Sequence, residues 1–444
     1  MMVEDRTYLI SRVFSSSRLS ESKWPYMYPQ GEDSCDSKLS NGKRALEEDD
    51  DVDELNDDAR QTKSPKLMAL SIHGDQEEEE QQQSDSNNNA DADADDDSLI
   101  SDIGRDNSIS CLIRCARSDY SSVASVSRSF RSLVKSGDIY RLRRQNQIVE
   151  HWVYFSCQLL EWVAFNPVER RWMHLPRMPS SVTFMCADKE SLAVGTDLLV
   201  LGRDDGFTHV IYRYSLLTNS WSSGLRMNHP RCLFGSASLG EIAIFAGGCD
   251  PLGKICDSAE MYNSELQTWT TLPKMNKPRK MCSGVFMDGK FYVIGGISGS
   301  GSKVLTCGEE FDLETKKWTE IPEMSPPRSR ETPASSEAPP LVAVVNNQLY
   351  VADHADMEVR KYDKESKKWF TLGRLPERAD SVNGWGLAFK ACGERLIVIG
   401  GLKNSGGGFI ELNSWIPSSS PPQWTLLDRK HSSNFVYNCA VMGC

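Results

Sequence analysis

The sequence lacks the short motifs that usually mark a catalytic or metal-binding site. Its seven histidines form no HxH, HxxxH or HExxH pattern, and none stands beside a spaced set of carboxylates. No GxSxG, no phosphate-binding loop and no dinucleotide-type GxGxxG before a helix occurs either. We therefore predict no catalytic residues, no metal site and no cofactor, and we expect a chain that is not an enzyme.

Long hydrophobic runs and paired cysteine motifs are missing as well. No run approaches the roughly 18 apolar residues that a membrane-spanning helix needs, and no apolar core follows a basic start as it does in a secretory signal. The 13 cysteines are scattered and include no CxxC, which is typical of reduced thiols inside the cell. These absences predict a protein of the nucleus and/or cytoplasm that binds neither membrane nor nucleic acid.

Residues 47–97 have few large apolar side chains and one dominant charge. They carry 20 acidic side chains and three basic ones, so their net charge is −17, whereas that of the whole chain is −12. Such a segment cannot bury enough apolar surface to offset the entropy lost on ordering, and residues 1–97 are predicted to be disordered. We interpret this region as a solvating spacer or, alternatively, as a segment that occupies the chain's own basic surface and competes with its target.

What the sequence does have is a tryptophan that recurs with a long, regular period. Five tryptophans each follow an aromatic residue after six intervening residues, and they are spaced by 48 to 51 residues; Trp424 follows 55 residues after the fifth. The five pairs are Phe165/Trp172, Tyr214/Trp221, Tyr262/Trp269, Phe311/Trp318 and Tyr362/Trp369. A repeat of about 50 residues is typical of the blades of a β-propeller.

Three repeats also contain an apolar run that ends in two glycines, 21 to 23 residues before the tryptophan: Gly247-Gly248, Gly295-Gly296 and Gly400-Gly401. The run predicts a buried strand that bends where glycine permits positive φ or a close neighbour. In the repeat around Trp318 the predicted strands are roughly 281–287, 290–295, 307–311 and 317–321. Each such repeat runs from an apolar stretch through two glycines and an aromatic residue to a tryptophan. This pattern resembles the kelch repeat, and the resemblance covers residues 152–444.

The two ends of the repeat region predict how the ring closes. Residues 152–157 already correspond to the second strand of a blade, so the first repeat lacks its first strand, while the apolar segment 434–442 has no blade of its own. Because closure removes exposed sheet edges, we predict that this last strand completes the first blade of a six-bladed propeller. The alternative is that the segment is a frayed tail.

Residues 98–150 have a helical character instead. Apolar residues fall at helical spacing between Ser118 and Gly137, with Ser118 or Asp119 as the expected cap and Gly137 as the expected end. A shorter apolar turn over 109–113 precedes this helix, and a further short helix is expected over 138–150. Three or four small helices in about 50 residues cannot bury all their apolar surface alone, so we expect the module to dock onto a partner.

This module resembles an F-box, the helical motif that inserts into the Skp-type adaptor of a cullin ubiquitin ligase. Leu99-Ile100 stands at the motif's entry, Leu112-Ile113 in its first helix and the block 126–130 in its core helix, although Ser101 and Ser127 replace the preferred proline and cysteine. The resemblance implies adaptor binding by Leu99, Ile100, Ile103, Leu112, Ile113, Val126 and Phe130. The alternative is a helical cap that contacts no other protein. A helical segment of this kind followed directly by kelch-like repeats resembles the plant F-box/kelch-repeat proteins.

The loops of such a propeller divide between two faces. The short links 288–289, 313–315, 364–366 and 393–394 share one face, which we interpret as inert, and the long connections share the other. Function on a rigid scaffold usually resides in the longer loops. These are rich in basic residues, which favour an acidic or phosphorylated target. We predict target binding by Arg226, Arg231, Lys277, Arg279, Arg328, Arg330, Arg378 and Arg429, with bracing of the blades as an equal alternative for Arg231, Arg279 and Arg328.

Together these patterns predict a mainly β chain. It comprises a disordered acidic region over 1–97, a helical F-box over 98–137, a linker helix over 138–151 that spaces the domains, and a six-bladed kelch propeller over 152–444. The resemblance implies the substrate-recognition subunit of a Skp-cullin-F-box (SCF) ubiquitin ligase, which holds an unidentified target protein. A kelch scaffold outside the ubiquitin system is the alternative. A kelch oxidase is the third possibility, and the seven histidines of the chain support it only weakly.

Overall fold

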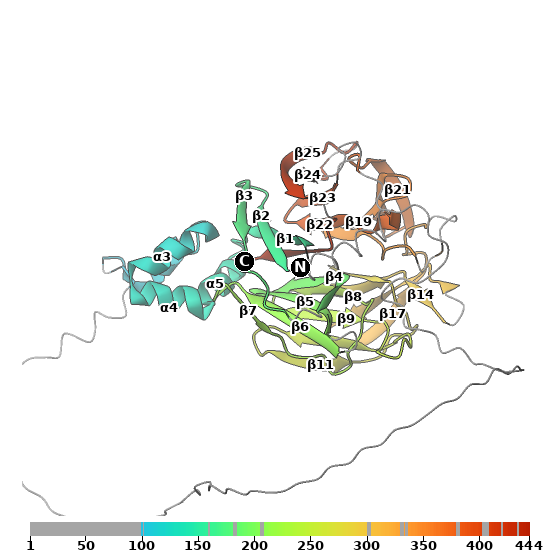
Figure 1. Cartoon of the computed structure of the whole chain (residues 1–444), viewed down its shortest axis with the longest axis horizontal. Coiled ribbons are helices and arrows are strands. Elements are labelled where there is room, and N and C mark those ends of the chain that lie inside the picture. The colour runs from blue at the N-terminus through green and yellow to red at the C-terminus, as the bar shows by residue number, and fades with distance from the viewer. Residues whose placement is uncertain are drawn as a thin grey trace, which may run out of the picture. The chain divides into compact units, whose positions relative to one another are not determined.

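Six four-stranded antiparallel sheets surround a central axis in the computed structural model, which describes residues 99–444 apart from short gaps (Figure 1). The gaps are at 101, 159, 181–183, 205–207, 300–302, 329–332, 334–335, 379–381, 402–407, 419–420 and 433–434. The predictions for residues 1–97 and for Arg330 therefore lie outside the described residues. Residues 99–444 belong to a single compact unit, which holds both helices and sheets.

The first three blades hold the tryptophans at 172, 221 and 269. Blade 1 consists of β26 (Asn438–Gly443), β1 (His151–Gln158), β2 (Glu161–Asn166) and β3 (Arg171–His174). Blade 2 consists of β4 (Met185–Val194), β5 (Asp197–Asp204), β6 (Thr208–Ser215) and β7 (Ser220–Ser223). Blade 3 consists of β8 (Gly235–Leu239), β9 (Ile242–Ala246), β10 (Ala259–Asn263) and β11 (Thr268–Leu272).

The other three blades hold the tryptophans at 318, 369 and 424. Blade 4 consists of β12 (Ser283–Met287), β13 (Lys290–Ile294), β16 (Gly308–Asp312) and β17 (Lys317–Ile321), with a small hairpin of β14 (Ile297–Ser298) and β15 (Lys303–Val304). Blade 5 consists of β18 (Val342–Val345), β19 (Gln348–Asp353), β20 (Glu358–Asp363) and β21 (Lys368–Arg374). Blade 6 consists of β22 (Ala388–Cys392), β23 (Arg395–Gly401), β24 (Gly408–Trp415) and β25 (Thr425–Ser432), and η2 (Val382–Gly384) precedes it.

The last strand closes the ring, as predicted. β26 is the innermost strand of blade 1 and pairs antiparallel with β1, with Trp152 opposite Met442 and Phe155 opposite Cys439. The inner strands β26, β4, β8, β12, β18 and β22 each contact the next around the ring. Closure by a strand from the far end of the repeat region leaves no blade with an unpaired inner edge. The six-bladed propeller and its closure are therefore confirmed.

The tryptophan period reflects contacts both within and between blades. In five blades the aromatic residue and its tryptophan are paired across the two outer strands, with ring centroids 4.7 to 5.4 Å apart. Each indole N–H then donates to the preceding blade: for example, Trp221 Nε1 to Pro176 O (2.7 Å) and Trp318 Nε1 to Pro273 O (2.8 Å). These half-buried tryptophans therefore join neighbouring blades as well as filling the core of their own.

The doublets Gly247-Gly248 and Gly295-Gly296 leave room for the backbone of a neighbouring connection, as their pattern predicts, whereas Gly400-Gly401 continues β23 without positive φ. Gly247 and Gly248 have φ of 72° and 92°. A Cβ on Gly247 would lie 2.4 Å from Arg279 O of the next blade, and a Cβ on Gly248 would lie 2.4 Å from Cys232 O. Both the positive φ and the close approach require glycine.

The helical module consists of α2 (Gly104–Leu112), the 3-10 turn η1 (Arg117–Asp119), α3 (Tyr120–Val126), α4 (Arg128–Ser136) and α5 (Asp138–Gln145). The prediction of one helix from Ser118 to Gly137 is wrong, because the helix breaks at Ser127. That residue is extended (φ −149°, ψ 169°), and its Oγ accepts a hydrogen bond from Phe130 N at 3.2 Å, which caps α4. Gly137 ends α4 in the left-handed region, as expected (φ 84°).

Candidate functional site

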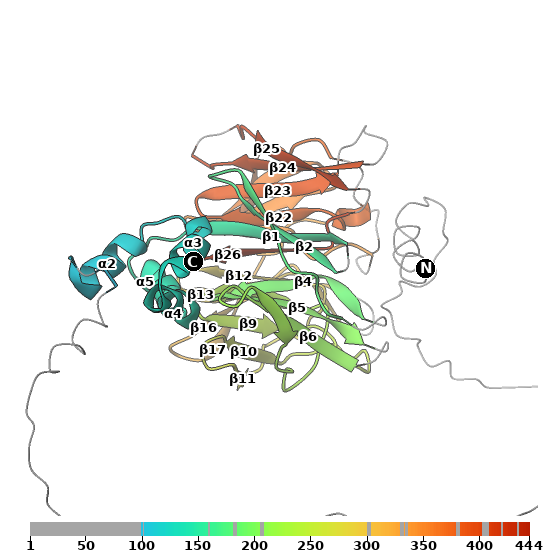
Figure 2. The same cartoon turned by 60° about the vertical axis from the view of Figure 1, so that its left-hand side comes forward.

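The helical module is packed against the face of the propeller that carries the short turns, here called the tight-turn face. Figure 2 shows α2 to α5 together at one end of the strands. Arg144 of α5 pairs with Glu241 in the β8–β9 turn. Gly137 leaves room for Leu217 of the β6–β7 turn, because a Cβ there would lie 3.1 Å from Leu217 Cδ1. The interpretation of this face as inert is therefore wrong.

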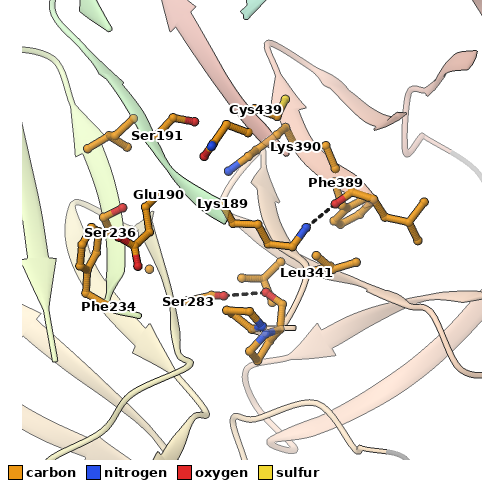
Figure 3. A pocket seen from close by; sticks show the side chains of 18 of the residues that line it. Lys189, Glu190, Ser191, Phe234, Ser236, Ser283, Leu341, Phe389, Lys390 and Cys439 are labelled. Atoms are coloured by element: carbon orange, nitrogen blue, oxygen red, sulfur yellow. Dashed lines mark hydrogen bonds between the residues drawn. The ribbon is translucent and has the colours of Figure 1, made fainter. Parts of the chain in front are cut away.

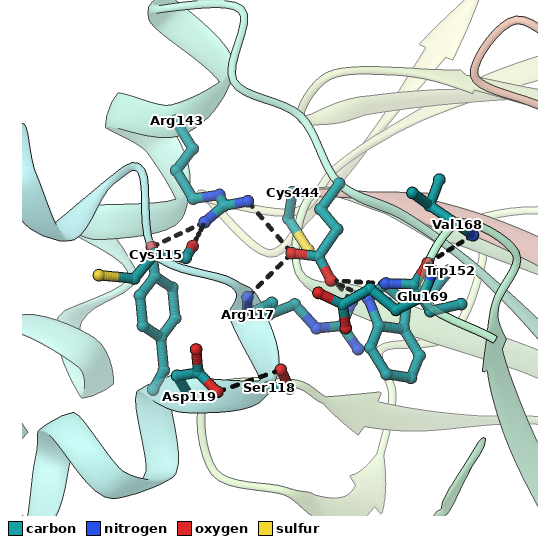
Figure 4. Close-up of polar contacts among 12 residues, drawn as sticks. Cys115, Arg117, Ser118, Asp119, Arg143, Trp152, Val168, Glu169 and Cys444 are labelled. Atoms are coloured by element: carbon teal, nitrogen blue, oxygen red, sulfur yellow. Dashed lines mark hydrogen bonds and ion pairs between the residues drawn. The ribbon is translucent and has the colours of Figure 1, made fainter. Parts of the chain in front are cut away.

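Glu150 is the centre of a polar network that joins the helices to blade 1. Figure 4 labels three of its partners, Arg117, Arg143 and Trp152. Its Oε2 accepts hydrogen bonds from Arg117 N (2.8 Å) and Arg143 Nη2 (3.3 Å). Its Oε1 accepts from Trp152 Nε1 (2.6 Å) and Asn166 Nδ2 (3.0 Å). Because the Arg143 side chain is almost fully buried, this carboxylate supplies the nearby negative charge that a buried guanidinium needs.

Arg117 extends the same network into the propeller. Its guanidinium lies 4.6 Å from the centroid of the Trp152 ring, and its Nη2 donates to the Tyr154 hydroxyl at 2.6 Å. Burial raises the pKa of Tyr154 to about 12, although the charge of Arg117 acts in the opposite direction. A buried arginine from the helices is thus bound directly to the first blade.

The helices and the first two blades share one hydrophobic core. Ile139 and Tyr140 of α5 are buried in the same cluster as Trp152, Tyr154 and, from blade 2, Tyr214. The predicted linker helix forms over Asp138–Gln145, but it does not space the domains apart. The module therefore completes its core on the propeller, which holds it rigidly.

The predicted adaptor-binding residues divide into a buried and an exposed group. Leu99, Leu112, Ile113 and Phe130 are buried in the shared core. Ile100, Ile103 and Val126 expose 39%, 40% and 72% of their surface. Within α2 only Ser108 and Leu112 are buried, so most of this helix is open to a partner. The exposed group is available for direct contact, and the buried group holds the helices that present it.

Three of the predicted target-binding arginines lie inside the propeller. Arg279 Nη2 is 2.6 Å from Glu309 Oε1, and both side chains are fully buried. Arg231 is similarly buried beside Glu260 and donates to Ser258 O at 2.6 Å. Arg378 is also buried and lies 3.2 Å from Glu411. These residues offer no surface to a target. The contacts of Arg231 and Arg279 favour the bracing alternative, because each ties an inter-blade connection to its own blade. Arg378, predicted only to bind the target, is buried in the same way.

The other predicted target-binding residues are more accessible. Arg226 is exposed. Lys277, Arg328 and Arg429 pair with Glu320 (2.5 Å), Glu337 (3.5 Å) and Glu411 (2.8 Å), and only Arg328 of the three is largely buried. Three exposed lysines also lie on the long loops and connections of blades 3 and 4: Lys254, Lys274 and Lys303. The sequence pattern already places Lys274 on a long connection and Lys303 in the long loop 297–306.

A cavity of about 100 Å³ lies at the long-loop end of the central channel, between the starts of the inner strands (Figure 3). Lys189, from an irregular part of β4, reaches across it and donates to Leu387 O at 2.5 Å. Its neighbour Glu190 accepts from Leu233 N on the other side. A drug-sized ligand usually needs about 300 Å³ or more. This cavity is smaller, and the hydrogen bonds of Lys189 and Glu190 link the inner strands across it.

The described part of the chain holds neither a cluster of metal ligands nor a membrane-spanning helix. Between residues 99 and 444, gaps aside, no group of three or more histidine, cysteine, aspartate or glutamate side chains is placed to hold a metal ion. Over the same residues, no helix has the length and apolar character to cross a membrane.

Known proteins match both parts of this architecture. The Kelch motif family matches residues 230–276 and 278–325, which contain blades 3 and 4. The F-box/kelch-repeat protein SKIP11 of Arabidopsis thaliana is 72% identical over 477 aligned positions, covering 100% of both chains. The chain belongs to the plant F-box/kelch-repeat family. Two more F-box/kelch-repeat proteins from Arabidopsis thaliana are 58% and 51% identical, covering 98% and 100% of both chains.

Membership of the F-box/kelch-repeat family explains the order of the parts. The helical module, α2 to α5, comes first in the chain, and the six blades that carry the kelch repeats follow it. The resemblance predicted from the tryptophan period and the helical segment is confirmed.

Proposed function

We propose that the chain is the substrate-recognition subunit of an SCF-type ubiquitin ligase. In this proposal the F-box helices bind a Skp-type adaptor, and the face with the long loops, the long-loop face, binds the target protein. The observation that carries it is the placement of the two surfaces. Helices with exposed apolar side chains stand on the tight-turn face, and the long loops lie at the other end of the blades, where β14 is seen in Figure 1.

The adaptor surface in this proposal is centred on α2 and α3. Large exposed apolar side chains are typical of a protein-binding surface. Ile100 and Ile103, just before α2, and Val126, at the end of α3, are of this kind. The layer beneath them is fixed: Tyr120 donates its hydroxyl to Leu112 O at 3.0 Å, which joins α3 to α2. Docking would then require little rearrangement of the helices.

The proposed contribution to ubiquitin transfer is proximity. A target held at the long-loop face reacts with a ubiquitin-charged enzyme that other subunits supply, so the reaction gains from a high effective concentration. The core that α5 shares with blades 1 and 2 supports this role, because it fixes the orientation of the adaptor relative to the target. The chain itself acts as a receptor and transfers nothing.

The target surface is proposed to prefer acidic or phosphorylated segments. Arg226, Lys254 and Lys303 are exposed on the long-loop face, and grouped positive charge raises the association rate of negatively charged partners. Lys274 lies on the same face, although Asp257 is 3.2 Å away. The buried arginines are outside this surface. We therefore expect charge reversal at Lys254 and Lys303 together to weaken target capture, and reversal at Arg279 to act through folding.

Calorimetric titration of the purified full-length protein with a purified Skp-type adaptor tests the proposal. Introducing Ile103→Glu with Val126→Glu should weaken binding by about 100-fold, because two charges would enter an apolar interface. Phe370→Glu is the matched control, since Phe370 is exposed on β21, away from the helices. Wild-type affinity in the double variant would overturn the proposed adaptor surface. Failure of the wild type to bind any Skp-type adaptor would favour a scaffold outside the ubiquitin system.

A further inference from the structure

Two cysteines face each other at the base of a long loop in blade 3. Cys232 N donates to Cys249 O (3.0 Å) and Cys249 N donates to Cys232 O (2.8 Å), so the two residues form a reciprocal antiparallel pair. Their Sγ atoms are 3.5 Å apart. Residues paired in this way have Cα atoms about 5.5 Å apart, which lies within the range of about 4.4–6.8 Å that a disulfide spans. A bond between them needs only small side-chain movements.

The charges around the pair make one thiol the better nucleophile. The hydrogen bond shared by the two sulfurs lowers the pKa of Cys249, and the positive charges of Lys280 and Arg203 act in the same direction, although burial and the charge of Glu190 oppose them. The shared hydrogen bond and burial raise the pKa of Cys232, although Arg203 acts in the opposite direction there. These directions favour Cys249 as the attacking thiolate. Arg203 Nη2 also lies 3.1 Å from Cys232 Sγ.

We propose that Cys232 and Cys249 form a reversible disulfide when a hydroperoxide oxidises them. The Cys249 thiolate attacks one oxygen of hydrogen peroxide, the O–O bond breaks, and the released hydroxide takes up a proton to become water. The sulfenic acid left on Cys249 is then attacked by the Cys232 sulfur. An S–S bond forms, the S–O bond breaks, and the oxygen leaves as a second water with the Cys232 proton. Two thiols are oxidised and one peroxide is reduced to two waters.

Burial of the pair selects the oxidant. Cys232 is 7% exposed and Cys249 is 4% exposed. A small hydroperoxide therefore fits this site better than a bulky disulfide such as oxidised glutathione, which must align its own S–S bond with the attacking sulfur. The modification is independent of the proposed ligase role, because it needs only the geometry of blade 3.

The bond would tie down a loop of the long-loop face. Asp250 Oδ1 accepts from Leu252 N and Lys254 N, each at 2.9 Å, which holds the loop tip in a turn. At that tip Leu252 is 89% exposed. The disulfide would link the base of this loop to the connection that carries Arg231. We expect oxidation to slow opening of the loop and to change how readily its tip adapts to a partner.

The test uses the full-length protein treated with hydrogen peroxide and digested without reduction. Mass spectrometry should find a peptide linked through Cys232 and Cys249, a loss of two free thiols and full reversal by dithiothreitol. Because the bond closes a short loop, the Tm should rise by about 5 °C. Hydrogen exchange of residues 250–255 should slow as well. Links to other cysteines instead, or over-oxidation of Cys249 without a link, would overturn the proposal.

Matched variants separate the pair from general thiol reactivity. Cys232→Ser and Cys249→Ser should each abolish the peroxide-dependent rise in Tm, while Cys111→Ser, at an exposed thiol, should keep it. Arg203→Met should slow formation of the linked peptide several-fold, because it removes a positive charge next to the pair. The peptide map of the oxidised wild type shows whether Cys232 and Cys249 are linked, even if a serine variant fails to fold. Equal linking rates with peroxide and with oxidised glutathione would contradict the assigned oxidant.

Discussion

Basic residues on the long connections have two distinct structural roles. Arg279 and Arg231 are buried against glutamates of their own blades, whereas Arg226 is exposed. Net charge along the sequence does not separate these roles, since the partners are about 30 residues away. The signal that does is a glutamate two residues before the paired aromatic residue, as in Glu260 and Glu309. Buried arginine at the propeller connections is thus a structural part of the blade.

Alanine should destabilise the protein strongly at a buried arginine and hardly at all at an exposed one. Arg279→Ala leaves the fully buried Glu309 carboxylate without its partner, and the free energy of unfolding should fall by about 3–5 kcal/mol. Arg226→Ala should change it by no more than about 0.5 kcal/mol. Urea denaturation of both variants measures the difference. A small effect for Arg279→Ala would mean that the buried pair does not brace blade 4.

His209 makes stability depend on pH. Burial lowers the pKa of His209 to about 4, and the positive charge of Arg203 acts in the same direction. In the unfolded chain the pKa is about 6.5, so acid protonates the unfolded state first. The contribution of this residue is complete above pH 6.5 and is lost as the pH falls toward 4. The urea midpoint should drop less between pH 7 and pH 5 in His209→Gln than in the wild type; equal drops would refute this origin.

At the scale of single elements, the sequence pattern predicts strands better than helices. The tryptophan period locates every blade because each repeat supplies the same buried positions, and it leaves β26 as the missing strand of blade 1. In the sixth blade Trp424 packs on Trp415, with ring centroids 5.7 Å apart. Because the connection between these two tryptophans is two residues longer than in the other blades, a search for six intervening residues does not find the pair. The break at Ser127 was missed because apolar spacing continues across it, although Val126 is in fact exposed.

Removal of β26 tests the closure of the ring. Deleting residues 435–444 would expose the edge of β1 and the buried side chains of Trp152 and Tyr154. An open ring also leaves the inner contacts of β26 with β4 and β22 unmade. The thermal transition should fall by at least about 10 °C or lose its cooperativity, because many kcal/mol of burial disappear. An unchanged transition in scanning calorimetry would show that the strand is dispensable.

At the scale of the whole molecule, the F-box and the propeller are one folding unit. The shared core follows from apolar residues on α5 that face blades 1 and 2, such as Ile139. The sequence predicts these helices but not where they pack on the propeller. The polar partners of that contact, Arg144 and Glu241, lie 97 residues apart in the chain. This joint between the helices and the propeller rests on the shared core and on the Arg144–Glu241 ion pair.

Glu150→Gln should weaken that joint. The variant keeps the shape of the side chain but removes the charge next to the buried Arg143 and the backbone of Arg117. The free energy of unfolding should fall by about 3 kcal/mol. Glu169→Gln is the control, because Glu169 is half-exposed and pairs with the exposed Arg171 at 3.6 Å. Similar urea midpoints for the two variants would show that the Glu150 network does not stabilise the contact between the helices and the propeller.

The most direct test of a two-faced receptor is hydrogen–deuterium exchange of the full-length protein with and without a purified Skp-type adaptor. The account predicts slower exchange within residues 102–131, which contain α2 and α3, and unchanged exchange in the long loop 247–258 and the connection 273–282. Slower exchange in those two segments, with none in the helices, would contradict it, because the adaptor would then occupy the face assigned to the target.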